Sequence, residues 1–180
     1  MATQVTNQPA AAGPVVGSRT AFTALMNVKP GHEKIVRELI SADQGKPELE
    51  AALREIGTLH EFRWAMLDDD RRVTFASSFD GEWYTYIQDF ASTQIGQVID
   101  RNLQHCEGWV GIQDPTAADW LLDHAIPAIM YDCAYPEPSV KEVRKALAVQ
   151  KAFEQVLDDP DAAEALQHPA LKPLLDQAAD

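Results

Sequence analysis

The stretch TLHEFRWAMLDDDRRVTFASSFDGEW, residues 58–83, contains two runs in which side chains alternate between two faces. Residues 59–67 form the first run and residues 72–79 the second, and a period of two is typical of a β-strand. The four charged residues between them, at 68–71, have the length and polarity of a turn. The pattern therefore predicts a β-hairpin. In its first strand, alternation places His60 on the same face as three large apolar residues: Phe62, Trp64 and Met66.

The period changes directly after the hairpin. Apolar residues now recur at three and four positions, at Trp83, Tyr86, Ile87 and Phe90, which is typical of an amphipathic helix. Asp80 precedes this helix, and its carboxylate could cap the first amides. The second strand is therefore expected to lead into a helix without a linker.

The flanking segments complete an α+β pattern. The predicted elements are a strand at 19–28, a helix at 33–42, a short helix at 47–56, a helix at 82–103 and a fourth strand at 105–112. Ser92 and Gly96 indicate an irregularity within the longest of these helices. This βαββαβ order is that of the ferredoxin-like fold, an antiparallel sheet covered on one face by two helices. The other face would expose Phe, Trp, Met or Leu side chains, which predicts a homodimer that pairs through the sheet.

The remaining segments predict the domain organisation. Residues 1–18 lack periodicity and are rich in Ala, Thr, Gln and Pro, so we expect a flexible N-terminal arm. Residues 19–157 form the main domain, which includes an extra strand at 129–135 and an amphipathic helix at 139–157. Residues 158–180 form a C-terminal helical tail.

Composition limits the classes of function. A formal charge of −13 over 180 residues argues against nucleic acid, because a phosphate backbone binds clustered Lys and Arg. There is no apolar run of membrane-spanning length and no signal peptide pattern, so we expect a cytoplasmic protein without membrane contact. Cys106 and Cys133 are too few for a disulfide framework or a zinc knuckle and are expected to be small buried hydrophobes.

Three segments carry a resemblance to a known superfamily. LHEFRW, then LDDDRRVTFASSFDGEWYTYIQDF, then AYPEPSVKEVRKAL resemble the dimeric α+β barrel superfamily, in particular a group of mostly uncharacterised bacterial and fungal domains. The resemblance extends over residues 20–157. The superfamily includes cofactor-independent monooxygenases, haem-handling enzymes and muconolactone isomerases. The resemblance therefore implies a homodimer and an oxygen- or haem-dependent oxidoreductase acting on an apolar or aromatic substrate, with the cofactor otherwise unknown.

Two side chains of the hairpin are candidate catalytic residues. His60 could act as a general base or as an axial ligand of haem iron, and the alternative is a structural histidine at a strand end. Arg63, on the opposite face, could clamp a substrate carboxylate. The alternative for Arg63 is a structural ion pair with Glu107 or Asp132 on a neighbouring strand. The spacing of His60, His105 and Glu107 matches no known metal motif, so we predict no metal site.

Aromatic residues supply the candidate pocket. An apolar cavity with one or two polar groups is the usual layout for an organic ligand. The residues predicted to bind substrate are Phe22, Phe62, Trp64, Phe75, Trp83 and Tyr86. The alternative for aromatic residues on the helix is that they belong to the core. Two functions remain open: a small-molecule enzyme, or a non-catalytic dimeric module that binds ligands or proteins.

Overall fold

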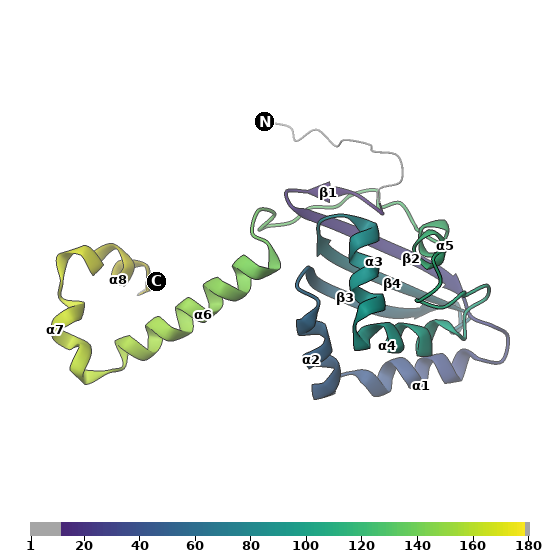
Figure 1. The fold of residues 1–180 in the computed structure, drawn as a ribbon, viewed down its shortest axis with the longest axis horizontal. Helices are drawn as coiled ribbons and strands as arrows, with labels where there is room; N and C mark the ends of the chain where they lie inside the picture. The colour runs from purple at the N-terminus through teal and green to yellow at the C-terminus, as the bar shows by residue number, and fades with distance from the viewer. Residues whose placement is uncertain (1–11, 179–180) are drawn as a thin grey trace. The chain divides into compact units, whose positions relative to one another are not determined.

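The computed structural model describes residues 12–178. It has a mixed α+β architecture and divides into two units, one ending at Val140 and one beginning at Lys141 (Figure 1). The first unit contains a four-stranded antiparallel sheet, and the second contains helices. The division between the two units lies at the start of the long helix at 140–157, whereas the sequence placed a boundary after that helix, at residue 157.

Three long strands dominate the sheet. β2 (Arg19–Asn27), β3 (Leu59–Leu67) and β4 (Arg72–Asp80) pair in the order β2-β4-β3, and the two-residue strand β1 (Val15–Val16) pairs with the outer edge of β2. All the pairs are antiparallel. The predicted hairpin of β3 and β4 is confirmed.

The hairpin turn uses three consecutive aspartates in the left-handed region. Asp68, Asp69 and Asp70 have φ values of 54°, 54° and 66°. Asp tolerates this conformation better than most residues because its short side chain can bond locally to the backbone. Arg72 pairs with Asp68, and Arg37 pairs with Asp70. These ion pairs offset the repulsion between adjacent carboxylates.

Helices cover one face of the sheet. α1 (Glu33–Asp43), α2 (Pro47–Glu55), α3 (Trp83–Ser92) and α4 (Gln94–Leu103) lie in front of it in Figure 1. The register places Phe22, Ser77 and Phe62 side by side on adjacent strands, followed by Ala24, Phe75 and Trp64. The aromatic residues of this face form the core together with the apolar sides of the helices.

The predicted helix at 82–103 is interrupted where an irregularity was expected. It divides into α3 and α4 at Thr93. At Gly96 a Cβ atom would lie 2.7 Å from the carbonyl oxygen of Phe90, so a larger residue would clash with the end of α3. The expected cap is wrong: Asp80 is the last residue of β4, and Glu82 takes the N-cap position of α3 without a side-chain bond.

The predicted fourth strand at 105–112 does not form. Cys106 makes a single antiparallel bridge to Val28, and the following residues form turns. Gly108 and Gly111 have φ values of 73° and 99°, which an extended strand cannot accommodate. The outer edge of β2 is instead completed in parts. β1 pairs with its first residues, Ala125, which follows the helix α5 (Ala117–Asp123), bridges to Ala24, and Cys106 bridges to Val28 just beyond the strand.

The predicted extra strand at 129–135 is also absent. This segment crosses the face of the sheet that the helices leave open: the Tyr131 and Ser78 hydroxyls lie 3.2 Å apart, and Arg19 Nη1 donates to Cys133 Sγ over 3.0 Å. A segment that lies on a face has no strand edge to pair with. The free thiol of Cys106 is buried as expected, whereas that of Cys133 is only half-buried.

The composition of the open face differs from the expectation. Phe62, Trp64 and Met66 lie on the covered face, whereas the open face of β3 carries Glu61, Arg63, Ala65 and Leu67. The sheet itself therefore does not present an aromatic surface. The most exposed large apolar residues on this side come from the crossing segment, namely Ile129, Met130 and Tyr135, and Leu67 of β3 is 39% exposed.

The two ends of the chain complete the description. Of the predicted flexible arm, residues 1–11 lie outside the described residues, but Val15–Val16 form β1 because β-branched residues favour a strand and Gly17 turns the chain at a φ of 62°. The second unit consists of α6 (Val140–Leu157) and the short helices η1 (Pro160–Ala162), α7 (Ala163–Leu166), η2 (Pro169–Leu171) and α8 (Lys172–Ala178). None of residues 141–178 is buried. Across residues 12–178, the helices lack the length and apolar character required to cross a lipid bilayer.

Candidate functional site

A pocket of about 330 Å³ lies between β3 and the helices, and we call it the β3 pocket. It is open beside an edge strand, where no further strand covers the aromatic side chains of the sheet. Its lining comes from every helix that covers the sheet as well as from two strands: Ile40, Asp43, Gln44, Leu49, Leu53, Leu59, Phe62, Arg63, Trp64, Phe75, Phe90, Ile95, Val98, Ile99 and Asn102. It therefore gathers residues far apart in the sequence.

One side of the β3 pocket is aromatic. The ring centroids of Phe62 and Trp64 lie 6.2 Å and 4.7 Å from that of Phe75, which in turn lies 6.4 Å from Phe90. These separations are typical of interacting aromatic rings. Phe75 and Phe90 are buried, but Phe62 and Trp64 are only half-buried and line the open space. The four rings form a continuous aromatic wall.

The opposite side is aliphatic. α1 supplies Ile40, α2 supplies Leu49 and Leu53, and α4 supplies a stripe of Ile95, Val98 and Ile99. Residues three and four apart share a helix face, so the sequence spacing of α4 dictates this stripe. The position that continues the stripe by one further step is Asn102, which places a polar side chain among the apolar ones.

Asn102 marks a polar end of the β3 pocket. It is 2% exposed and lines the pocket at the end of the stripe. Its Oδ1 atom is an acceptor without a donor among residues 12–178. A buried polar atom left without a partner costs about 1–3 kcal/mol. The arrangement therefore carries a cost that a suitable ligand would remove.

An ion-paired carboxylate lies at the same end. Asp43 is 7% exposed, and its Oδ1 accepts from Lys46 Nζ over 3.1 Å while its Oδ2 accepts from Arg101 Nη2. Both carboxylate oxygens of Asp43 thus have cationic partners. The charge of Asp43 is balanced within the protein and is not left for a ligand.

Three of the six predicted substrate-binding residues line the β3 pocket, namely Phe62, Trp64 and Phe75. The other three belong to the packed core, where Phe22, Trp83 and Tyr86 are 1%, 4% and 1% exposed. Phe22 and Trp83 have ring centroids 4.2 Å apart, and Tyr86 stacks on Phe79 at 3.9 Å. For Trp83 and Tyr86 the alternative interpretation, a core role, describes the structure, and Phe22, which was expected to line the pocket, lies in the core as well.

The Tyr86 hydroxyl is a second buried polar group, and its surroundings differ from those of Asn102. Burial raises the pKa of Tyr86 above its usual value, and the nearby Ser77 hydroxyl partly offsets this by lowering it. The Ser77 hydroxyl therefore lies close enough to the Tyr86 hydroxyl to affect its pKa. Like Asn102 Oδ1, the Tyr86 hydroxyl makes no hydrogen bond among residues 12–178, but Tyr86 does not line the β3 pocket.

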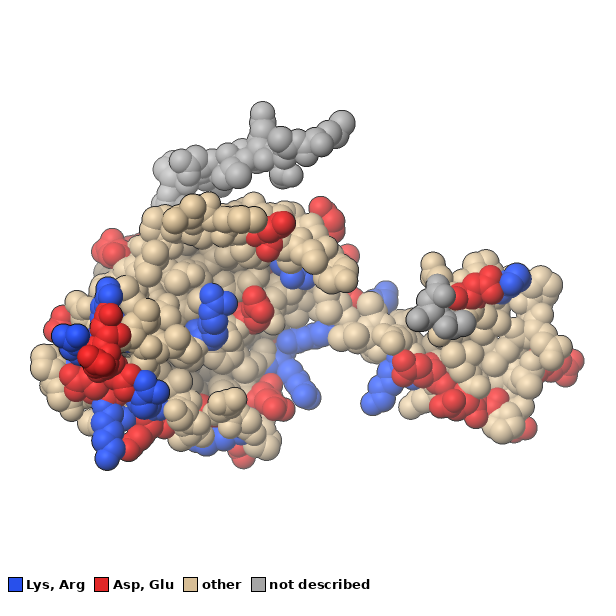
Figure 2. All heavy atoms as spheres, turned by 180° about the vertical axis from the view of Figure 1, so that it is seen from behind, with Lys and Arg blue, Asp and Glu red and all other residues tan. Residues whose placement is uncertain are grey.

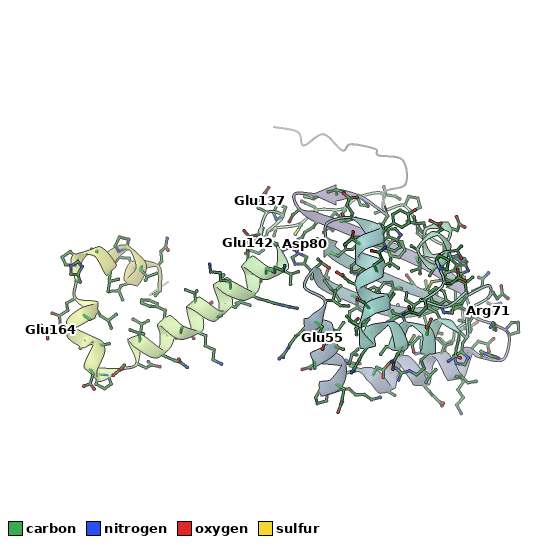
Figure 3. The ribbon with its side chains drawn as sticks, viewed as in Figure 1. Glu55, Arg71, Asp80, Glu137, Glu142 and Glu164 are labelled. Atoms are coloured by element: carbon green, nitrogen blue, oxygen red, sulfur yellow. The ribbon has the colours of Figure 1, made fainter. Side chains whose placement is uncertain are left out.

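His60 lies outside the β3 pocket. It is the extra residue of a β-bulge between Leu59 and Glu61, which takes it off the face of Phe62 that simple alternation predicted. Its Nε2 lies 2.7 Å from Asp80 Oδ1, and Asp80 Oδ2 accepts from the backbone N–H of Val140 over 2.7 Å. Asp80 lies at one end of β4 and Arg71 lies near the other (Figure 3). The structural alternative for His60 therefore fits its contacts.

Arg63 lies on the open face, opposite Ala76, and borders both the β3 pocket and a smaller hollow of about 220 Å³ on the other side of the sheet. Among the described residues it makes no ion pair. The proposed partners are engaged elsewhere: Glu107 accepts from Asn27, and Asp132 accepts from the backbone of Cys133. The expected pairing is therefore wrong, and strand register directs Arg63 away from the aromatic wall.

The residues of the β3 pocket do not fit a haem group. Haem iron is held by His, Cys, Met or Tyr, and none of these residue types lines the pocket. His60 does not line the pocket, and its Nε2 lies 2.7 Å from Asp80 Oδ1. No step is therefore assigned to haem.

The histidine that the sequence grouped with His60 lies elsewhere. His105 Nδ1 is 2.9 Å from His32 Nδ1, and burial, together with the charges of His32 and Lys29, lowers the pKa of His105. Within residues 12–178, no group of three or more His, Cys, Asp or Glu side chains is arranged to hold a metal ion.

Sequence reasoning did not identify Asn102 or Asp43 as site residues. The signal for Asn102 was present, because the spacing of Ile95, Val98 and Ile99 reaches Asn102 at the next step of the apolar stripe. Asp43, near the end of a helix, carried no comparable signal.

In comparisons with protein-family models, curated proteins and solved structures, nothing matches this chain.

Proposed function

We propose that the first unit binds a small, flat, apolar molecule in the β3 pocket. The observation that carries this proposal is the open aromatic wall: Phe62 and Trp64 remain half-buried beside a hollow of about 330 Å³. A well-packed core leaves few voids larger than a water molecule. Known ligand pockets begin at about 300 Å³, and an apolar cavity of about 150 Å³ can bind benzene. The β3 pocket is therefore large enough for two fused rings.

We propose binding rather than catalysis. A reaction that proceeds without a cofactor needs a side chain able to move a proton at the substrate. Of the ionisable residues that line the pocket, Asp43 is held by two cations and Arg63 is directed to the other face. The oxidoreductase that the superfamily resemblance implies would need such a group. The non-catalytic alternative suits this lining better.

The test is to fill the pocket. Isothermal titration of the full chain with 2-naphthol should give a Kd of the order of 100 µM, which corresponds to about half a kcal/mol per non-hydrogen atom. Leu53→Trp, which places an indole in the space, should abolish the heat of binding. Leu147→Trp makes the same change on α6, where the side chain is 60% exposed, and should leave binding unchanged. Unaltered binding by Leu53→Trp would disprove this location.

We further propose that the first unit is a variant of the ferredoxin-like fold and a relative of the dimeric α+β barrels. The support is the strand order β2-β4-β3, with α1 and α2 between β2 and β3, and with α3 and α4 after β4. The bridge from Cys106 to Val28 lies where the fourth strand of that fold would pair. An experimental structure with a different order of the long strands would contradict this proposal.

A homodimer is proposed on the side of the sheet opposite the helices. Ile129, Met130 and Tyr135 are 105%, 82% and 74% exposed, and exposed apolar patches usually mark interfaces. Figure 2 is drawn from behind the view of Figure 1, and on the first unit it shows mostly uncharged atoms, with the densest group of charged atoms at one edge and other charged atoms spread over the rest of the surface. Sedimentation equilibrium should give about twice the monomer mass of 19.9 kDa. Met130→Lys should shift it toward monomer, Val149→Lys on α6 should not, and a monomeric wild type at micromolar concentration would refute the dimer.

A further inference from the structure

Asn102 is a buried amide at the end of an otherwise apolar stripe. Its 2% exposure and its place in the lining of the β3 pocket mean that any molecule filling the pocket comes close to it. The side chain does not cap α4, whose C-cap is Gln104. Among residues 12–178 its Oδ1 accepts no hydrogen bond, although an amide can both donate and accept. The folded chain alone therefore gives this oxygen no structural task.

The neighbouring charges do not use Asn102 either. Asp43 is satisfied by Lys46 and Arg101, so neither of its oxygens needs the amide. Arg101 Nε is also buried without a hydrogen bond among the described residues, but Arg101 does not line the β3 pocket. The lining otherwise presents carbon atoms at this depth: Leu59 and Ile99 are buried, and Gln44, the remaining amide, is exposed. Asn102 is thus the buried polar side chain that a ligand can engage.

We infer that Asn102 determines the specificity of the β3 pocket, by selecting a neutral aromatic molecule that carries a hydroxyl or N–H group over the corresponding hydrocarbon. This inference rests on the proposed function. A hydroxyl group both donates and accepts, so it satisfies either the oxygen or the nitrogen of the amide.

Burial selects against an acid at the same position. The cluster at that end holds one anion and two cations, but Lys46 and Arg101 both bind Asp43, so a ligand carboxylate beside Asn102 would lose its water without a cation of its own. Burial of an unpaired charge is far more costly than burial of a hydroxyl that makes a hydrogen bond. The ligand class is therefore an uncharged aryl alcohol, a phenol or an aromatic N–H compound.

The test compares three probes of one shape on the full chain at pH 7. Titration of 2-naphthol, naphthalene and 2-naphthoate should show 2-naphthol binding about tenfold more tightly than naphthalene, which is the contribution of one net hydrogen bond of about 1.4 kcal/mol. 2-Naphthoate should bind more weakly than 2-naphthol.

The variant Asn102→Leu should reverse the preference. It keeps a side chain of similar size, removes the amide and should bind naphthalene at least as well as 2-naphthol. Asn27→Leu, which makes the same change outside the pocket, should keep the preference of the wild type. In amide-detected NMR, both probes should shift the side-chain NH₂ resonances of Asn102 through their ring currents, and 2-naphthol should add a further shift from the hydrogen bond that naphthalene lacks.

The outcomes separate the inference from the proposed function. Equal binding of 2-naphthol and naphthalene by the wild type, or a preference that survives in Asn102→Leu, would overturn the role of Asn102 and leave the β3 pocket as a binding site. Tight binding of 2-naphthoate would overturn the requirement for a neutral ligand. If none of the three probes binds, the proposed function fails and the inference fails with it.

Discussion

The covered face of the sheet has two ends that differ in how the helices close them. Toward β2, Phe22, Trp83 and Tyr86 pack against one another and are almost fully buried. Toward β3, Phe62 and Trp64 have the same chemistry and the same strand geometry but border an open pocket. The difference lies in what the helices place opposite each end, because aromatic rings of α3 fill the space over β2 and shorter aliphatic side chains of α2 and α4 leave space beside β3.

The largest expected effect on stability comes from truncating one aromatic residue at each end. Phe22→Ala should lower the free energy of unfolding by about 3–5 kcal/mol, because it leaves a cavity in a packed core. Phe62→Ala should cost about 1–2 kcal/mol, since part of the ring already faces open space. Urea unfolding monitored by tryptophan fluorescence measures both. Equal costs would mean that Phe62 is a core residue and that the two ends do not differ.

A smaller effect is expected at the polar end of the β3 pocket. Arg101→Met should cost about 1–2 kcal/mol, because Asp43 is buried and would retain only Lys46 as a cationic partner. The comparison variant is Arg54→Met, whose partner Glu50 is on the surface, so the loss should stay below about 0.5 kcal/mol. If the two variants unfold at the same urea concentration, the Asp43 pair is no more important than a surface pair.

Asn102→Leu should stabilise the protein, in contrast to the variants above, which destabilise it. Removing a buried amide whose oxygen accepts no hydrogen bond among residues 12–178 should raise the stability of the ligand-free protein by about 1 kcal/mol, seen as a higher Tm. The variant would then gain stability while losing the preference for 2-naphthol, the trade-off expected when a residue is retained for binding. A lower Tm would indicate that Asn102 supports the fold after all.

The smallest predicted effect concerns alkaline pH at the packed end. Burial raises the pKa of Tyr86 above its ordinary value of 10.0, so the unfolded chain releases this proton first as the pH rises. The contribution of Tyr86 to stability is therefore present below about pH 10 and lost above it. Between pH 8 and pH 10.5, the free energy of unfolding, measured by urea unfolding, should fall less for Tyr86→Phe than for the wild type. Tyr135→Phe, at a position 74% exposed, should follow the wild type, and identical curves for all three proteins would contradict the prediction.

Much of the fold could be predicted from local pattern. Alternation over 59–67 and 72–79 fixed the hairpin, and the change of period at Trp83 located α3. The prediction of a fourth strand was wrong because glycines in the left-handed region break an apolar run that otherwise alternates well. The prediction of an extra strand was wrong because alternation identifies a strand-like segment but does not show whether the sheet has a free edge for it.

The site was only partly predictable, for a similar reason. Alternation placed Phe62, Trp64 and Phe75 on one face, and the structure brings these three into the pocket. It could not separate them from Phe22, because burial of that ring depends on α3. It also assigned His60 to the wrong face, since one extra residue in a bulge shifts the side chains on one side of it and leaves no mark in composition.

The absence of buried side chains in residues 141–178 affects how unfolding of this protein is observed. All four tryptophans, at 64, 83, 109 and 120, belong to the first unit. Indole emission therefore follows the melting of the sheet and its helices alone. Ellipticity at 222 nm also includes the signal of α6. This helix has no buried core of its own, and an isolated helix of its length is only marginally stable in water. The two signals should give separate transitions, and a single Tm assigned to the whole polypeptide would average two events.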